Sequence, residues 1–562
     1  MSSSCEKSGG CFAAFCAAHC SSGWPRRLSH LPRPVRPFVR KDGRQEATLS
    51  YRNSGKSFSA WAKVTVAGQE SYIVSLGSLS AGSGSVMLPV TDTNALLKPG
   101  ETTTLRVELY ADAACTGEPV AAFTDEAWAR TRHWQFYLSQ EMHTDLGYTA
   151  YPEDLKKAFS GYLDTVQTYM QNSDERATDL EKYHYAIESG FAMGDAYMQN
   201  RSADQIGGLV DWIKAGRMTI GAGAFNFTME NFSAEETARA AYYTNRHLVD
   251  MLGIEPSTTQ RMFDNPSFSK SYVDIAAEAG IKYGIHSMNP DRSPYCQKKQ
   301  YDLFYMEGMN PENRLLIFNG KHYGDNYGFG GDHGSSEGGA ELATSRLLGL
   351  ISDLEARTGR NAYIYDKFPL ALVPVGDNRA PMEEQVIVAN AVNKNWDDAG
   401  YAWPRITTAF PEQFFEEVEA EYGDLIPVET GTEENWWNDG WATTAYESGV
   451  NKVAGNRIPV AETLSSFAAL FTGKAYPYED IKEAVDRNLI YDEHTWGFAG
   501  YDGGEQYHKQ FEWKRSNAFG AASLADKLLD DAMRSMASTV STSGPAVYVY
   551  NPLNWVRDDV VT

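Results

Sequence analysis

The feature that most constrains the fold is a change of sequence pattern near residue 132. Between residues 133 and 427, short apolar segments alternate with longer segments whose apolar residues recur at helical spacing. This alternation is typical of an α/β domain with a largely parallel, barrel-like sheet and helices on its faces. The helical segments are Pro152–Asn172, Ser202–Ala215, Ala234–Leu252 and Ser269–Gly280, and the strand candidates are Met218–Gly221, Lys282–Ile285 and Ala362–Tyr365.

The region before this domain has the pattern of a β-sandwich. Residues 47–132 contain short segments that alternate apolar and polar residues, such as Ala60–Val66 and Thr103–Tyr110. Glycine and serine turns separate these segments, as in two-sheet β-domains. The sequence therefore predicts an accessory β-sandwich domain ahead of the α/β domain.

The region after the α/β domain is predicted to be a helical bundle over residues 428–540. Its apolar residues recur three and four positions apart in three long segments, Val460–Phe471, Tyr478–Asn488 and Ser516–Ala537. Residues 541–562 are predicted to begin a C-terminal β-region, with a strand and a turn within Ala546–Trp555. The whole chain is thus expected to be a multidomain protein.

The composition restricts the partners. A formal net charge of −24, with no basic stripe, argues against binding to nucleic acid or to an anionic membrane surface. An acidic, aromatic-rich chain suits a neutral polar substrate such as a carbohydrate. Residues 1–46 are expected to be disordered or a doubtful start, and the apolar run Phe12–Ala18 is too short to cross a bilayer. A degraded signal sequence is one interpretation of this segment, but its positive charges follow the apolar run instead of preceding it. A secreted or periplasmic location is slightly favoured, and a cytoplasmic one stays open.

The clearest chemical signal is His143 followed by Asp145, directly after the apolar run Trp134–Leu138. In a strand, residues two apart point the same way, so an imidazole and a carboxylate would converge on one point. That pair is half of a site for a divalent metal such as zinc. The alternative is a histidine and an aspartate that merely end a strand.

Two other segments place polar groups where strands or helices end. Asp264 follows the apolar Met262-Phe263 and precedes a helix that Ser269 caps, so it would lie at the carboxyl end of a strand, or else only begin an Asx turn. His494 lies in a polar, aromatic loop between two helical segments. Considered alone, it would be a surface or capping histidine.

Further residues are candidates for lining a pocket. The loop Gly221–Asn231 follows a strand, and its small residues would let the backbone approach a ligand; it lacks the spacing of a dinucleotide-binding loop. Several tryptophans near residue 437 could form a floor for a sugar ring or could belong to the bundle core. The candidate substrate-binding residues are Tyr148, Glu188, Asn226, Thr228, Asp377, Trp437, Asp439 and Trp496.

Taken in order, these motifs resemble glycoside hydrolase family 38, the zinc-dependent α-mannosidases, over residues 133–562. His143-Thr144-Asp145-Leu146-Gly147-Tyr148 resembles the family's H-x-D-x-G-W segment, and Phe263–Ser269 resembles its D-P-F-G-H-S segment. Glu493–Gly497 falls where the family has its second histidine motif. The resemblance implies that His143, Asp145 and His494 bind Zn²⁺, that Asp264 is the general acid/base and that Tyr148 faces a sugar.

The sequence departs from the family at the nucleophile. The family's nucleophilic aspartate, which is also a zinc ligand, would lie within Phe225–Asn231, where this chain has no aspartate and Thr228 is near the position. Since a retaining glycosidase needs two carboxyl groups, Glu230 is a substitute if the loop is reshaped, and water activated by the metal is the alternative.

Three functions follow from these interpretations. The first is a zinc-dependent carbohydrate hydrolase with Asp264 as acid and Glu230 or water as nucleophile. The second is a catalytically inactive, carbohydrate-binding relative, which the missing aspartate favours. The third is another zinc-dependent reaction on polysaccharides, such as deacetylation or elimination. The sugar, the linkage and the oligomeric state stay open.

Overall fold

The computed structural model describes residues 32–175, 182–264, 268–288, 302–320, 326–330, 338–373, 377–431, 439–496 and 504–560. The chain divides into two compact units. The first comprises Met1–Arg36 and Asp42–Thr131, and the second comprises Pro37–Lys41 and Arg132–Thr562. The chain therefore has several sheets and many helices, arranged as in a multidomain protein.

The described part of the first unit consists of antiparallel strands around its own apolar core. β2 pairs with β5, β3 pairs with β4 and β6, and β6 pairs with β7. Alternate residues of these strands are buried in one core that includes Leu49, Val64 and Leu105. The strands are β2 (Arg44–Asn53), β3 (Phe58–Val66), β4 (Tyr72–Leu79), β5 (Gly82–Thr91), β6 (Thr102–Tyr110) and β7 (Ala121–Ala129).

The second unit contains a five-stranded sheet whose described pairs are all parallel. Its central strand β8 is buried over almost its whole length, which is expected of a strand covered on both faces. The carboxyl ends of these strands lie at one edge of the sheet. The strands are β8 (Gln135–Glu141), β9 (Tyr185–Ile187), β10 (Met218–Ile220), β15 (Lys367–Leu372) and β17 (Arg405–Thr408).

A second five-stranded sheet of this unit has the order β11-β12-β14-β13-β18. Its described pairs are parallel except β13 with β14. The short strand β16 (Tyr401–Trp403) pairs instead with residues 39–40, which belong to the same unit. The strands of the second sheet are β11 (Thr259–Asp264), β12 (Tyr283–Met288), β13 (Leu303–Glu307), β14 (Arg314–Gly320) and β18 (Val428–Thr430).

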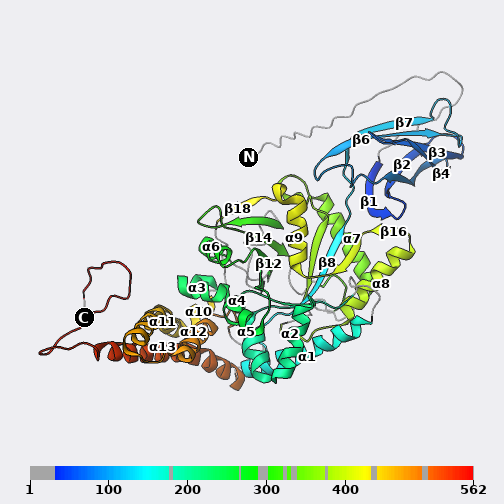
Figure 1. The fold of residues 1–562 in the computed structure, drawn as a ribbon. Helices are drawn as coiled ribbons and strands as arrows, with labels where there is room; N and C mark the ends of the chain where they lie inside the picture. The colour runs from blue at the N-terminus through cyan, green and yellow to red at the C-terminus, as the bar shows by residue number, and fades with distance from the viewer. Residues whose placement is uncertain are drawn as a thin grey trace, which may run out of the picture. The chain divides into compact units, whose positions relative to one another are not determined.

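Helices surround these sheets, and α11, α12 and α13 pack against one another as a separate group (Figure 1). Ser202 and Ser233 each form a capping box, which explains where α2 and α3 begin. The helices are α1 (Pro152–Asp174), α2 (Ala203–Lys214), α3 (Ala234–Ala241), α4 (Tyr243–His247), α5 (Val249–Leu252), α6 (Lys270–Glu278), α7 (Ala340–Ala356), α8 (Glu384–Asp398), α9 (Pro411–Tyr422), α10 (Asp439–Thr443), α11 (Ala445–Thr472), α12 (Tyr478–Tyr491) and α13 (Glu505–Ala537). Short turns of helix are η2 (Ala192–Met198), η3 (Met229–Asn231), η5 (Gly359–Asn361) and η6 (Gly423–Leu425).

The predicted helix Ala234–Leu252 is broken into α3, α4 and α5. The break arises because helix backbone groups bond to the loop after β10 instead of to one another. Ala224 N–H donates to Ala240 O at 2.9 Å, and Thr244 N–H donates to Ala222 O at 3.0 Å. These bonds tie the broken helix to the loop that begins at Gly221.

Three other predictions are wrong for the described residues. β1 (Pro32–Arg40) is a strand inside the segment expected to be disordered. Ala362–Tyr365 is not a strand, because β15 begins only at Lys367, where its partner β8 has Gln135 opposite. Ala546–Trp555 is exposed and pairs with no described strand, so no ladder of hydrogen bonds forms there.

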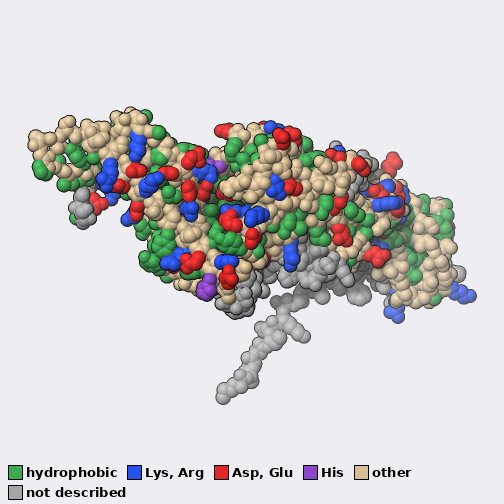
Figure 2. All heavy atoms as spheres, turned by 90° about the horizontal axis from the view of Figure 1, so that it is seen from below, with side chains coloured by type: hydrophobic (Ala, Val, Ile, Leu, Met, Phe, Trp, Pro, Cys, Tyr) green, Lys and Arg blue, Asp and Glu red, His purple; other side chains and the backbone are tan. Residues whose placement is uncertain are grey.

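No helix in the described part of the chain combines the length and the apolar character needed to cross a bilayer. On the face that Figure 2 shows, Lys and Arg side chains are scattered among Asp and Glu side chains. This distribution is that of an ordinary mixed, solvated surface.

Candidate metal centre

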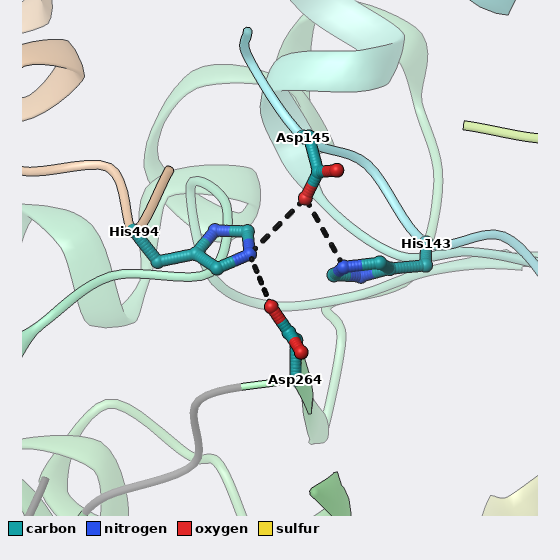
Figure 3. A group of neighbouring side chains, drawn as sticks. All are labelled: His143, Asp145, Asp264 and His494. Atoms are coloured by element: carbon teal, nitrogen blue, oxygen red, sulfur yellow. Dashed lines mark ion pairs between the residues drawn. The ribbon is translucent and has the colours of Figure 1, made fainter. Parts of the chain in front are cut away.

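Four side chains from three distant segments meet in the second unit (Figure 3). His143 and Asp145 follow β8, Asp264 is the last residue of β11, and His494 follows α12. The two residues after β8 lie in a loop, not within the strand itself, yet their side chains converge as the spacing predicts. All four residues are buried.

The four side chains are close enough to share one cation. Asp145 Oδ1 lies 3.2 Å from Nε2 of His143 and 3.2 Å from Nε2 of His494. Asp264 Oδ2 lies 3.4 Å from Nε2 of His494. One nitrogen or oxygen atom from each residue can be chosen so that all four atoms lie within 4.8 Å of one another.

Three of the six distances among the four candidate ligand atoms fit a zinc-like ion. Ligand atoms about 2.0–2.2 Å from zinc lie about 3.3–3.6 Å apart at the corners of a tetrahedron. The three separations of 3.2, 3.2 and 3.4 Å are close to that edge length. Two imidazole nitrogens and two carboxylate oxygens are also a donor set that zinc accepts.

Carboxylates lie behind both imidazoles. Glu188 Oε1 is 3.1 Å from Nδ1 of His143, and Glu493 Oε1 is 2.8 Å from Nδ1 of His494. Histidine ligands of metals commonly have such a partner, which fixes the ring so that Nε2 faces the ion. The hydrogen bond with Glu188 therefore orients the His143 ring toward the shared centre, and the carboxylate of Glu493 places a negative charge beside Nδ1 of His494.

The centre carries an excess of buried negative charge. Burial by itself lowers the pKa of His143, but the charges of Glu188 and Asp145 outweigh it and raise that pKa well above its usual value. Burial likewise lowers the pKa of His494, and Glu493 raises it. Carboxylates buried in such number need positive partners, which a cation would supply.

Side chains from four separate segments hold the loop that carries His143 and Asp145. Each accepts a hydrogen bond from a backbone N–H of the loop, which compensates for the loss of strand pairing. The bonds are Thr144 N to Glu188 Oε2 at 2.6 Å, Asp145 N to Asn378 Oδ1 at 2.8 Å, Leu146 N to Glu493 Oε1 at 3.3 Å, and Tyr148 N to Gln510 Oε1 at 2.6 Å.

Gln510 of α13 makes a second contact with the same loop. Its Nε2 donates to Ala150 O at 3.0 Å, so that one amide bridges the backbone of Tyr148 and Ala150. Gly147 has φ +135, and a Cβ there would lie 3.0 Å from Gln510 Oε1. The positive φ therefore favours a glycine at this position, and a side chain there would crowd the amide of Gln510.

A buried ion pair joins the strands that end at the centre. Arg261 of β11 donates through Nε to Glu141 Oε2 of β8 at 3.0 Å and through Nη2 to Glu412 at 2.8 Å. Burial would raise the pKa of Glu141, Arg261 opposes it, and the net result is a pKa of about 7. The pair fixes β8 and β11 relative to each other just before His143 and Asp264.

The other predicted site residues have varied positions. Asn226 is buried in the centre and donates from Nδ2 to Glu188 Oε1 at 2.7 Å. Thr228 is also buried, whereas Glu230 is exposed in η3 and does not belong to the buried group. Tyr148 is 39% exposed with φ +60, so it is accessible to solvent.

Asp377 is half-buried beside Asn378 in the chain. Trp496 is half-buried and packs edge-on against Trp441 and Tyr491, which is the arrangement of a small aromatic core. Trp437 lies outside the described residues, and Asp439 is the first residue of α10.

Several supporting residues were not predicted. They are Asn378, Glu493, Gln510 and Lys514. Nζ of Lys514 donates to Glu493 Oε2 at 2.9 Å. The sequence could have indicated Asn378, because it is next to Asp377, and Glu493, because it is next to His494. Gln510 and Lys514 lie on a long helix and have no local signal.

Comparisons with known proteins bear on both sequence and fold. The sequence profile of the glycosyl hydrolases family 38 N-terminal domain matches residues 133–436. A crystal structure of an α-mannosidase from Enterococcus faecalis V583 matches with a TM-score of 0.55 and 16% sequence identity, over 73% of this chain and 43% of that chain. The chain thus spans less than half the length of that mannosidase.

A second solved structure has a weaker likeness. An exo-type maltose-forming amylase from Pyrococcus sp. ST04 matches at 10% identity and a TM-score of 0.37, over 72% of this chain and 80% of that chain. A comparison with curated protein sequences found no match. The family profile and the first structure therefore carry the comparison.

Proposed function

The chain belongs to glycosyl hydrolase family 38, and from that premise we propose that it is a zinc-dependent glycosidase of α-mannosidase type. It would hydrolyse glycosidic bonds of oligosaccharides or polysaccharides. The observation that carries the proposal is the convergence of His143, Asp145, Asp264 and His494 on one point. Family membership alone would not require that these four residues meet.

In this proposal the four residues hold one Zn²⁺ ion. When bound, the ion supplies a Lewis acid that attracts sugar hydroxyls and polarises the ring near the bond to be broken. Glu188 and Glu493 keep the two imidazoles turned toward the ion. The exposed Tyr148 would offer an aromatic face to the sugar.

The proposal assigns a role to each region of the chain. Residues 133–427 form the catalytic domain, and residues 428–540 form the helical bundle that supplies His494. We also propose that the catalytic domain is barrel-like and that residues 47–132 form a β-sandwich.

The second candidate function is an inactive, carbohydrate-binding relative, which Thr228 favours because it stands near the position of the family's nucleophile. The two candidates differ in turnover. Purified protein would be analysed for bound metal by mass spectrometry and then assayed with 4-nitrophenyl α-mannoside, a panel of other α- and β-aryl glycosides, and acetylated oligosaccharides.

The proposal expects about one zinc per chain and release of nitrophenol from the α-mannoside, abolished by a chelator and restored by zinc. Zinc binding with all glycosides intact would overturn it in favour of the inactive relative. Release of acetate instead of nitrophenol would indicate a different zinc-dependent reaction on polysaccharides.

A further inference from the structure

Asn226, in the loop after β10, touches each of the three segments that carry the candidate metal ligands. Its side chain contacts His143 and the backbone of the residue before Asp264, and its carbonyl contacts the backbone of His494. The residue is 0% exposed. A side chain with no exposed surface and with both amide atoms bonded to the protein has no group left to offer a sugar.

The amide of Asn226 joins two of these segments. Nδ2 donates to Glu188 Oε1 at 2.7 Å, and Oδ1 accepts from Phe263 N at 3.1 Å. If the amide were turned over, its oxygen would face a carboxylate and its NH2 group would face an N–H, so both contacts would become repulsive. The two partners therefore determine the orientation of the amide, and the amide fixes the spacing between them.

The bond to Glu188 bears directly on His143. Nδ1 of His143 lies 3.1 Å from Glu188 Oε1 and 3.2 Å from Nδ2 of Asn226. An ionised carboxylate only accepts hydrogen bonds, so the imidazole carries its proton on Nδ1 and presents the lone pair of Nε2 to the centre. The other oxygen of Glu188 accepts from the backbone and the hydroxyl of Thr144. Asn226 thus completes the set of donors that holds Glu188 behind the ring.

The bond to Phe263 acts on the end of β11. Asp264, the next residue, has a φ of +74, a conformation that residues other than glycine rarely adopt. Such a conformation persists where the surrounding structure enforces it. The bond from Phe263 N to Asn226 fixes the backbone directly before this turn. The direction in which Asp264 leaves the strand therefore depends on Asn226.

The backbone of the same loop pairs with the segment that carries His494. His494 N donates to Asn226 O at 3.0 Å, and Phe227 forms an antiparallel bridge with Glu493. Two carbonyls earlier in the loop accept hydrogen bonds of 2.9 and 3.0 Å from the segment after β9. The loop is thus held on both sides, and Asn226 is a fixed point between the sheet and the end of α12.

We infer that Asn226 is a positioning residue of the metal centre, which holds the candidate ligands in register through its amide and its carbonyl. This role replaces the substrate-binding role that the sequence suggested. The inference rests on the proposed function, because it takes the four residues as ligands of one zinc ion. Ligands have to be held within about 0.5 Å of the productive geometry, and here they come from three segments that Asn226 bonds together.

Zinc affinity measures this role without turnover. Competition with a chromogenic chelator would compare wild type, Asn226→Ala and the control Asn393→Ala. Asn393 of α8 is a matched control because its amide also makes one donor and one acceptor bond, both with the backbone of Ile406. Asn226→Ala should weaken zinc binding about 10- to 100-fold, as removal of a group behind a ligand does. Asn393→Ala should bind zinc as wild type does, although the lost bonds lower its stability.

An exchange of the amide and the carboxylate tests the contact between Asn226 and Glu188, and it decides the matter if Asn226→Ala does not fold. In the double variant Asn226→Asp/Glu188→Gln the net charge is unchanged. The new carboxylate at position 226 would accept from Phe263 N and face Nδ1 of His143, and the new amide at position 188 would donate to it. The double variant should therefore bind zinc at least about tenfold more tightly than Glu188→Gln alone, with folding checked by circular dichroism.

The outcomes separate a positioning role from a substrate-binding role. Equal zinc affinities of Asn226→Ala and wild type would overturn the inference, and a raised KM for an aryl mannoside in excess zinc would then assign Asn226 to the substrate. A double variant that binds zinc no better than Glu188→Gln would also overturn it. In both cases a wild type that binds zinc and cleaves the glycoside would still support the proposed function. A wild type that binds no zinc would overturn the zinc-dependent function and the inference together.

Discussion

The imidazole rings of His143 and His494 lie with their centroids 5.4 Å apart, although one follows a strand of the parallel sheet and the other follows a helix of the α11–α13 group. Their Nε2 atoms are each 3.2 Å from the same oxygen, Asp145 Oδ1. A site formed in this way requires the helical group to remain packed against the sheet. Metal binding and folding of the unit should therefore be linked.

Metal removal should destabilise the second unit. An ion bound only by the folded protein contributes about 4 kcal/mol when its free concentration is 1,000 times its dissociation constant. Dialysis against a chelator should lower the midpoint of thermal unfolding by several degrees, and added zinc should restore it. The His494→Ala variant should show the same midpoint in chelator and in zinc. A midpoint of the wild type that stays the same in chelator and in zinc would contradict the metal centre.

Substituting Glu188 should weaken metal binding without removing a ligand. Glu188 orients His143 through Nδ1 and accepts from the backbone and the hydroxyl of Thr144. The Glu188→Gln variant should therefore bind zinc about 10- to 100-fold more weakly. Chelator competition measures this, with Glu153→Gln in the exposed first turn of α1 as the matched control. Equal affinities of Glu188→Gln and wild type would show that the glutamate does not support the ligand.

Removing the Gln510 side chain should loosen the loop that presents Tyr148. The Gln510→Ala variant leaves the backbone N–H of Tyr148 without its acceptor, which costs about 1–3 kcal/mol when the group stays buried. Urea unfolding measures that loss, with the exposed Gln413→Ala as control. If Tyr148 contacts the sugar, KM for an aryl mannoside should rise more than kcat falls. Lower stability with an unchanged KM would remove Tyr148 from substrate binding.

Asp486 of α12 should make stability depend on pH. Burial, with the charge of Asp195, raises the pKa of Asp486 to about 6, and the hydroxyl of Tyr243 donates to its Oδ1 at 3.5 Å. The folded state binds the proton of Asp486 more tightly than the unfolded state does. The stabilisation that this proton gives is therefore complete below about pH 4 and is lost as the pH rises through about 6. The loss should be on the order of 1–3 kcal/mol.

The test compares urea unfolding of wild type and Asp486→Asn at pH 5 and pH 8, both in chelator so that metal release does not contribute. Wild type should lose more stability than the variant between the two pH values. The positive groups near Asp486 and Asp195 are Lys482 and Lys156, which are unchanged in the variant. The same pH dependence in both proteins would exclude Asp486 as its source.

The sequence by itself determined the features that depend on short-range pattern. The alternation after residue 132 predicted parallel strands with helices between them, and β8, β9 and β10 pair in that way. The spacing of His143 and Asp145 predicted that their side chains converge, and they do so even though the loop lies beyond the strand. Spacing of this kind is visible locally because neighbours in the chain share one backbone geometry.

Only the tertiary structure decided which carboxylate joins the metal group. The sequence offered Asp264 as an acid and Glu230 as a nucleophile, but Asp264 is buried against His494 and Glu230 is exposed. The choice depends on the turn at φ +74 that ends β11 and on Asn226, which bonds both to Glu188 after β9 and to Phe263 of β11. The same holds for Gln510 and Lys514, whose partners lie far away in the chain. Contacts between distant segments are set by how sheets and helices pack, and packing has no signature within a few residues of sequence.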